Sequence, residues 1–223
     1  MIQYPKKTLL STPLAIAGTK AGHSPARLTL LVLLVPLVFC LSFVWAAQPL
    51  QVSYAEQSAV KEYELKAVYL YNFLQFVQWP DDKRAPAKDK SMVIGIIGES
   101  PFGEALEDLR REIRQRSMTP VRFVFYGTYE DVVRESRDIG SCNLLFLCPS
   151  EKDRFDRIIA DLGNAPILTV ADTETFLAAG GMITLVQNKG KIRWMVNRTA
   201  VDKAGLRVSA QLLSMAAKVI GGD

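Results

Sequence analysis

The segment VYLYNFLQFVQWP, residues 68–80, limits how this chain can fold more than any other feature. Ten of the thirteen residues from Ala67 to Trp79 are apolar or aromatic, and on a helix they point in every direction. A surface helix of a globular protein keeps one polar face. A helix at about 60–78, ending before Pro80, therefore needs apolar cover on two sides. We expect its own sheet on one side and a second chain on the other, with full burial inside one large domain as the alternative.

The start of the chain has the pattern of an export signal. Residues 1–27 carry four basic residues and no acidic residue, and Leu28–Trp45 is a run of eighteen mostly apolar residues. Small residues follow, so cleavage is expected after Ala46 or Ala55. An uncleaved anchor is the alternative, because a run of this length is just enough to cross a bilayer. Both interpretations place the remaining chain outside the cytoplasm, in the periplasm.

Removal of the leader makes the protein electrically neutral. The full chain has 27 Lys and Arg against 23 Asp and Glu, and the four basic residues of the leader account for the whole excess. A neutral domain favours neither nucleic acid nor an anionic membrane as a partner. The only histidine, His23, also lies in the leader, which excludes His-based general bases, catalytic triads and His-ligated metals from the mature chain. We therefore predict no cofactor and no metal site.

Apolar runs and helical segments alternate through the remaining chain. We expect residues 1–55 to be the signal peptide or N-terminal anchor, and 56–223 to be a single domain of ordinary size. The runs typical of buried strands are at 92–98, 121–127, 143–149 and 166–172. Strands that are joined through helices run parallel, with right-handed crossovers.

The end of the chain has a different pattern. GGMITLVQNKGKIRWMVN predicts an antiparallel hairpin with its turn at 187–190, and a final helix is expected from Ser209 to about Ile220. The predicted fold class is therefore α/β, with a mixed, mostly parallel sheet, a C-terminal antiparallel hairpin and helices on both faces.

Two places are candidates for binding a small ligand. In GIIGESPFG, Gly98 and Ser100 form a turn where nucleotide-binding folds bind phosphate, although the G-x-G-x-x-G spacing is missing. We expect Ser100 and Pro101 to open the helix that follows. In the hairpin, alternation places Arg193 and Asn197 on one face, where Arg193 meets either an anionic ligand or a carboxylate of the protein. The alternative for the first place is a simple tight turn.

No catalytic residue is predicted. The chain shows no paired-acid motif, no nucleophile elbow and no metal cluster. Cys142 and Cys148 bracket the third predicted strand, and six residues of extended chain span roughly 20 Å, whereas the Cα atoms of a disulfide lie about 4.4–6.8 Å apart. We expect two buried thiols and no bridge between them.

Two blocks of sequence resemble a known family. ELKAVYLYNFLQFVQWP has a helix pattern that ends in an aromatic–proline pair. GGMITLVQNKGKIRWMVNRTAVDKAGLRVSAQLLSMAAKVI has a double-glycine hairpin, an asparagine and a helix of the AGL…S..LL..A type. Both blocks, and the order in which they occur over about 61–220, are similar to the YfiR/HmsC-like family of small periplasmic proteins. Some members carry disulfides, but here the hairpin has no cysteine and Gly95 stands in the first strand, so we expect no disulfide switch.

The resemblance implies a non-catalytic periplasmic regulator that binds and represses a membrane-bound signalling protein. The implied partner is the sensor region of an inner-membrane diguanylate cyclase, so that repression lowers cyclic-di-GMP and restrains biofilm formation. Family members form dimers, and a homodimer is expected here. A periplasmic small-molecule-binding module that serves another membrane partner, and a hydrolase with an unrecognised site, are the alternatives.

The opening helix is expected to provide the interface. The residues expected to contact a partner or a second copy are Tyr69, Tyr71, Phe73, Phe76 and Trp79. Alternate faces must still pack on the sheet, so we expect Tyr71 and Gln75 to point outward and Phe73 and Phe76 to point inward.

Overall fold

Seven strands form one mixed sheet on which the rest of the domain is built. The computed structural model describes residues 49–80, 91–188 and 190–222, and the chain from Ser53 onward forms one compact unit. Residues 1–48, which are most of the expected leader (1–55), and residues 81–90 lie outside the described residues. The strands, in spatial order, are β3 (Val121–Phe125), β2 (Met92–Ile97), β4 (Leu144–Leu147), β5 (Leu168–Ala171), β6 (Ile183–Asn188), β7 (Lys191–Asn197) and β9 (Lys218–Ile220).

The predicted α/β class with a mostly parallel sheet is confirmed. The first five strands in this order run parallel, β7 returns antiparallel to β6, and β9 pairs parallel with β7. Because the chain crosses from β2 outward to β3 and then back to β4, the carboxyl ends of β2 and β4 form a topological switch point. Open α/β sheets bind ligands at such a point.

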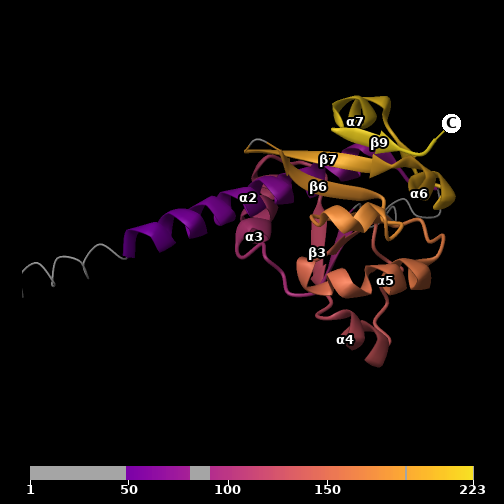
Figure 1. The fold of residues 1–223 in the computed structure, drawn as a ribbon, viewed down its shortest axis with the longest axis horizontal. Coiled ribbons are helices and arrows are strands. Elements are labelled where there is room, and N and C mark those ends of the chain that lie inside the picture. Colours follow the sequence, from indigo (N-terminus) through magenta and orange to yellow (C-terminus); the bar gives the residue numbers. More distant parts are fainter. Residues whose placement is uncertain (1–48, 81–90, 189, 223) are drawn as a thin grey trace, which may run out of the picture. The chain divides into compact units, whose positions relative to one another are not determined.

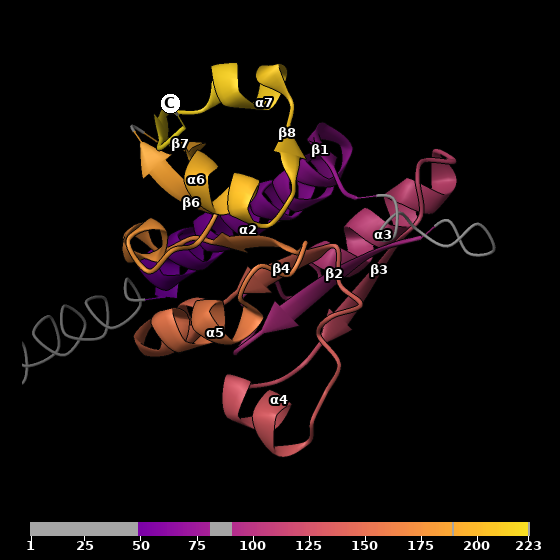
Figure 2. The same ribbon diagram turned by 90° about the vertical axis from the view of Figure 1, so that its right-hand side faces the viewer.

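Helices cover both faces of the sheet (Figures 1 and 2). On one face lie the long helix α2 (Pro49–Phe76) and α3 (Ala105–Gln115). On the other lie α4 (Tyr129–Arg134) and α5 (Phe155–Leu162). The sheet separates two hydrophobic clusters, one that contains α2 and α3 and one that contains α4 and α5. Strands β4 and β5 are buried along their whole length, as their continuous apolar sequences predict.

The opening helix is longer than predicted and ends earlier. The sequence predicted a helix at about 60–78, whereas α2 begins at Pro49, and Val77–Gln78 forms the short strand β1. β1 pairs antiparallel with β8 (Arg207–Val208), so the chain leaves the helix to pair with another segment. Pro80 disfavours the helical conformation at the residue before it, which is consistent with this early end.

Two further helix boundaries differ from the prediction. Ser100 and Pro101 do not open a helix, since α3 begins at Ala105 after a series of turns. The last helix, α7 (Ala210–Met215), is capped by Ser209 as expected, but it stops early and residues 218–220 become the edge strand β9. The β-branched pair Val219–Ile220 suits a strand and pairs with β7, so sheet pairing outweighs the apolar helical spacing.

Short helical segments complete the fold, and local capping explains two of them. Thr128 and Asp131 form a reciprocal capping box at the start of α4. The Asn197 side chain accepts a hydrogen bond from the Ala200 amide and starts α6 (Arg198–Lys203). The remaining segments are the 3₁₀ helices η2 (Pro149–Arg154) and η3 (Glu174–Leu177).

Truncation of Phe73 is expected to destabilise the domain strongly. The Phe73 ring is almost completely buried and meets the Trp194 ring edge-on at 5.7 Å, which joins α2 to β7. Phe73→Ala should lower the free energy of unfolding by about 3–5 kcal/mol, measured by urea denaturation. Gln75→Ala, at an exposed position of the same helix, is the matched control and should change stability little. Equal effects of the two substitutions would contradict this packing.

Candidate functional site

The expected interface residues of α2 are largely used by the domain itself. Tyr71, Phe73 and Trp79 are buried in the core, whereas Tyr69 and Phe76 are half-buried. Phe73 points inward and Gln75 outward, as predicted, but the outward placement of Tyr71 is wrong, because its side chain is only 4% exposed. The Tyr71 hydroxyl donates to the carbonyl of Thr119, which fixes this side chain against the loop before β3. A buried ring of this kind has no surface left for a second chain.

The apolar surface that α2 leaves uncovered lies before Tyr71 in the helix. Val60, Leu65 and Val68 are 53%, 42% and 37% exposed. We refer to these three side chains as the α2 ridge. Large aliphatic side chains gathered on one exposed stretch are typical of an interaction surface, whereas isolated ones are ordinary.

A groove runs beside the ridge, between α2 and α3. It has a volume of about 390 Å³, and both helices contribute apolar as well as charged side chains to its lining. Its lining residues are Lys61, Glu64, Leu65, Val68, Ala105, Asp108, Leu109 and Glu112. The acids from α3 are already paired, Asp108 with Arg111 and Glu112 with Arg116. The groove is therefore an apolar surface with a balanced charged rim.

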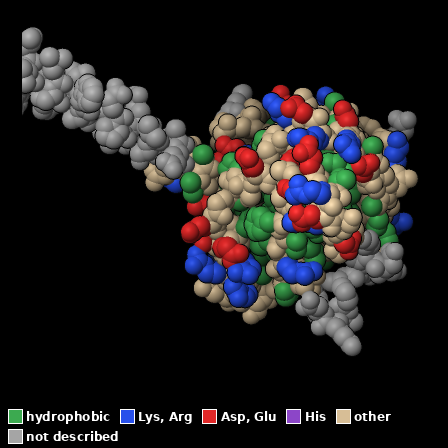
Figure 3. All heavy atoms as spheres, turned by 90° about the horizontal axis from the view of Figure 1, so that it is seen from below, with side chains coloured by type: hydrophobic (Ala, Val, Ile, Leu, Met, Phe, Trp, Pro, Cys, Tyr) green, Lys and Arg blue, Asp and Glu red, His purple; other side chains and the backbone are tan. Residues whose placement is uncertain are grey.

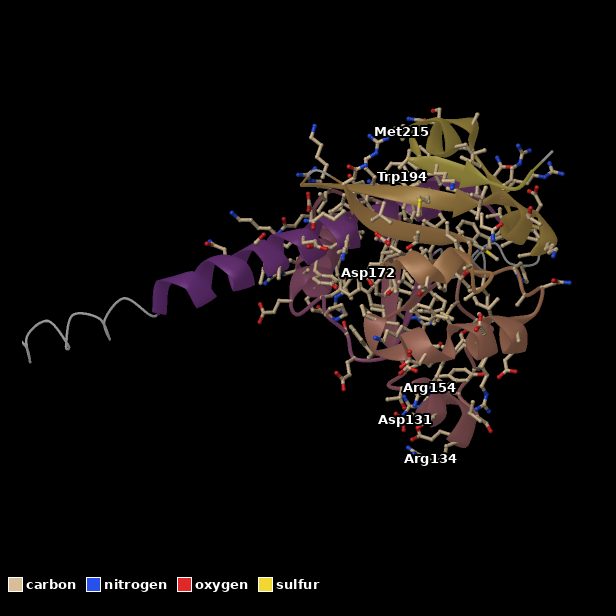
Figure 4. All side chains as sticks on the ribbon, viewed as in Figure 1. Asp131, Arg134, Arg154, Asp172, Trp194 and Met215 are labelled. Atoms are coloured by element: carbon tan, nitrogen blue, oxygen red, sulfur yellow. The ribbon has the colours of Figure 1, made fainter. Side chains whose placement is uncertain are left out.

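Charges of both signs also alternate elsewhere on the molecule. The face seen from below in Figure 3 carries acidic and basic side chains next to one another, with hydrophobic side chains between them. At that end Asp131, Arg134 and Arg154 gather beside α4 (Figure 4). Asp131 pairs with Arg134, and Arg154 pairs with Glu130 at 2.8 Å. Such paired surface charge suits neither a phosphate backbone nor an anionic membrane.

A buried polar cluster holds the ridge segment of α2 on the sheet. The Lys66 ammonium lies 2.6 Å from a carboxylate oxygen of Asp172, just beyond β5, and 2.6 Å from Glu62, one turn earlier on α2. The Tyr63 hydroxyl donates to the same Asp172 oxygen at 2.9 Å. The Lys66 and Asp172 side chains are almost fully buried, and Asp172 lies in the middle of the molecule in Figure 4. Sequence analysis missed this cluster.

The cluster continues along the carboxyl ends of the parallel strands, around Cys148. Burial is the main cause that raises the pKa of the Cys148 thiol to about 12, with smaller contributions from Asp172 and Glu151. Burial and then Asp172 raise the pKa of Tyr63 far above its ordinary value. One buried oxygen of Asp172 and one of Glu151 have no hydrogen-bond partner among the described residues. The thiol and the phenol therefore stay protonated, and neither serves as a nucleophile or a base at neutral pH.

Two signals in the sequence could have revealed the cluster. Lys66 interrupts an apolar helix segment, with Glu62 four residues before it, which is an ion-pair spacing. Asp172 follows a fully buried strand at the edge where parallel strands end. A charged residue in each of two otherwise buried elements requires a partner, and the two residues are each other's partner.

The glycine turn after β2 is closed. Gly98 has φ +101°, and a Cβ atom there would lie 2.5 Å from the Ser150 hydroxyl and 2.9 Å from Cys148. The amide of Glu99 already donates to the Ser150 hydroxyl at 2.9 Å, and Ser100 is exposed. The amide of Gly98 also donates, to the carbonyl of Gly127 at 2.7 Å, so two amides of the turn are already bonded, which favours the alternative of a tight structural turn.

Arg193 and Asn197 lie at a distance from that turn. They share one face of β7, as predicted, but Arg193 donates to the carbonyl of Met215 at the end of α7, and Asn197 caps α6. β7 runs antiparallel to β6 and the other parallel strands, so Asn197, at the carboxyl end of β7, lies at the end of the sheet where β2 begins. Gly98 lies at the other end, just after the carboxyl end of β2. These two positions are therefore at opposite ends of the sheet, and the four predicted ligand residues do not form one site.

The two cysteines lie on opposite faces of the sheet. Cys148 belongs to the cluster under α2, whereas Cys142 belongs to the cluster under α5, where the Tyr126 hydroxyl lies 3.3 Å from its sulfur. Both are fully buried thiols. A Cβ atom at Gly95 would lie 2.7 Å from the Cys142 sulfur, so the glycine makes room for this thiol.

Within residues 49–80, 91–188 and 190–222, no group of His, Cys, Asp or Glu side chains could hold a metal ion. Among the helices of these ranges, none combines the length and the apolar character needed to cross a bilayer. The apolar run Leu28–Trp45 lies outside the described residues.

The family model described as YfiR/HmsC-like matches residues 63–217, which is most of the chain and almost the whole described domain. The chain belongs to the YfiR/HmsC-like family. The match begins at Tyr63 of the buried cluster and includes α2 from there, the sheet and α7. Membership supports a periplasmic regulatory role for this YfiR/HmsC-like protein, in a family that is regulatory and not catalytic. No curated protein matches the chain.

Two solved structures are distantly similar to this YfiR/HmsC-like protein. A conserved domain protein from Vibrio cholerae O1 biovar El Tor is 12% identical, with a TM-score of 0.49 over 71% of this chain and 60% of that one. An ABC domain from Streptococcus pneumonia, in complex with L-Trp, is 9% identical, with a TM-score of 0.46 over 62% of this chain and 57% of that one. The chain thus spans less than two thirds of either protein, and neither similarity bears on its function.

Removal of the Lys66 ammonium is expected to destabilise the domain. Lys66→Met leaves the buried Asp172 carboxylate without its counter-charge, which typically costs about 3–5 kcal/mol. The double variant Lys66→Met with Asp172→Leu removes both charges and should recover most of that loss, measured by urea denaturation. Arg111→Met, which breaks an exposed pair, is the control and should cost less than about 1 kcal/mol. If the double variant loses as much free energy of unfolding as the two single substitutions together, Lys66 and Asp172 are not directly coupled.

Stability is expected to fall as the pH rises above 9, in part through Cys148. The thiol has a pKa of 9.0 when exposed and about 12 in the folded protein. Between these values the unfolded thiol ionises while the folded thiol keeps its proton, so the free energy of unfolding decreases as the pH rises. Urea denaturation at pH values of about 8.5 and 10.5 should show a smaller decrease for Cys148→Ala than for the wild type. Tyr63 contributes to the decrease that remains, and identical decreases would contradict the assignment to Cys148.

Proposed function

We propose that this protein represses an inner-membrane diguanylate cyclase by binding the sensor region of the cyclase in the periplasm. Repression lowers cyclic-di-GMP and restrains biofilm formation. Family membership supports the regulatory role, and the α2 ridge, Val60, Leu65 and Val68, is the observation that supports the mode of action.

The ridge fits a protein partner better than a small ligand. It is an apolar stretch of a helix beside a groove, and its three side chains remain exposed although Leu70, Phe73 and Leu74, further along the same helix, are buried. Burial of apolar surface contributes on the order of 25 cal/mol per Å², so a partner that covers the ridge and the groove gains affinity mainly from the hydrophobic effect. Because the charges on the rim are balanced, binding should depend only weakly on salt concentration.

The buried cluster supports the same function by fixing where the ridge points. Lys66 lies between Leu65 and Val68 in the sequence, and its ion pair with Asp172 holds this turn of α2 on the sheet. A preformed surface avoids the ordering cost that a flexible segment would incur on binding. The ridge is therefore a rigid docking surface.

Substitution of the ridge is expected to weaken partner binding and leave the fold intact. Val68→Asp places a charge in the middle of the apolar contact and should weaken binding to the purified cyclase sensor region by roughly tenfold or more, measured by titration calorimetry. In cells, cyclic-di-GMP and biofilm should rise. Val133→Asp is the matched control, because Val133 is a half-exposed valine on a helix of the opposite face and should have no effect on binding.

The same variants test the expected homodimer. If a second copy of the chain covers the ridge, light scattering will give a dimer mass for the wild type and a monomer mass for Val68→Asp, but not for Val133→Asp. If Val68→Asp and Val133→Asp both bind the sensor region as tightly as the wild type does, the proposed surface is wrong.

A further inference from the structure

A cavity of about 290 Å³ opens at the amino ends of β5 and β6, at the opposite end of the sheet from the Lys66–Asp172 cluster. It lies between the end of α5 and the start of α6. Its lining residues are Ile159, Leu162, Gly163, Asn164, Ala165, Ile167, Thr169, Gly180, Met182, Asn197, Thr199, Ala200 and Lys203. Asn197 is the one predicted ligand residue that reaches it.

The chemistry of the lining favours an anion with an apolar body. No acidic residue lines the cavity, and Lys203 is its one basic residue. Arg198 and Asp202 of α6 form an ion pair at 3.6 Å. Lys203 forms no ion pair with any residue that the structure describes. The apolar part of the cavity lining includes Ile159, Ile167 and Met182.

The polar side chains of Asn164, Asn197 and Thr199 line the same cavity as Lys203. Asn164 and Thr199, both exposed at the rim, make no side-chain hydrogen bond to any described residue. Asn197 uses its side-chain oxygen to cap α6, and its amide nitrogen remains as a donor. One ammonium group and nearby neutral donors are the groups that a carboxylate needs for charge-assisted hydrogen bonds.

We propose that this cavity is a binding site for a small organic carboxylate with an aliphatic or aromatic body. Its volume lies at the lower limit of known ligand sites, which admits an acid of about ten heavy atoms and excludes a nucleotide. The carboxylate pairs with Lys203, and the apolar body contacts Met182, Ile167 and Ile159. The site is separate from the α2 ridge, so it does not rest on the proposed partner.

Two carboxylates and their uncharged amides test this site directly. 4-Methylpentanoate and benzoate are titrated into the wild-type protein, with 4-methylpentanamide and benzamide as the neutral probes, and the methyl resonance of Met182 is followed by NMR. We expect at least one acid to shift this resonance and to bind roughly tenfold more tightly than its amide, which corresponds to about 1.4 kcal/mol.

The basic residue is tested by substitution. Lys203→Met should weaken acid binding roughly tenfold and remove the preference for the acid over the amide. Lys218→Met, at an exposed lysine on β9 that does not line the cavity, should leave both unchanged, and circular dichroism should show that both variants are folded. No shift of Met182 at ~10 mM of either acid would overturn the proposal. Equal affinity for acid and amide, or an unchanged preference in Lys203→Met, would also overturn it.

Discussion

The packing of α2 against the sheet is the constraint on which the rest of this structure depends. The helix enters the core through Leu70 and Phe73, and it is fixed two turns before Phe73 by the ion pair between Lys66 and Asp172. An ion pair with this degree of burial contributes little net stability compared with apolar packing, but loss of one partner is costly. It therefore acts mainly on specificity: it selects one rotation of α2 about its axis, and that rotation decides which side chains are left outside.

The rotation of α2 connects the fold to the proposed function. With Lys66 held inward, Leu65 and Val68 fall on the outside, and the groove toward α3 opens beside them. Because α2 is apolar on every side, it has two kinds of neighbour. The sheet of the same domain covers most of its C-terminal half, and the proposed partner covers the α2 ridge. The aromatic residues belong to the first contact together with Leu70 and Leu74, whereas Val60, Leu65 and Val68 belong to the second.

The sequence predicted the fold class because its signals are local and mutually consistent. Apolar runs such as NLLFLCP and PILTVAD can be placed only inside a covered sheet, and the turn before Lys191 gives the hairpin. Two of the boundaries that were wrong are decided by distant contacts: β1 forms because β8 lies beside it, and β9 forms because β7 offers an edge. The site was harder to predict for the same reason. Periodicity alone cannot orient a helix that is apolar on every side, so Tyr71 was placed outward, and the pairing of Lys66 with Asp172 spans 106 residues.

Photo-crosslinking from single positions in the periplasm of living cells tests the central claim most directly. A photoreactive amino acid is placed at position 65 or 68 of the α2 ridge, or at position 133 on the opposite face, in the full-length protein. We expect crosslinks from 65 and 68 to an inner-membrane signalling protein and none from 133. Crosslinks from position 133 to that protein, with none from the ridge, would contradict it.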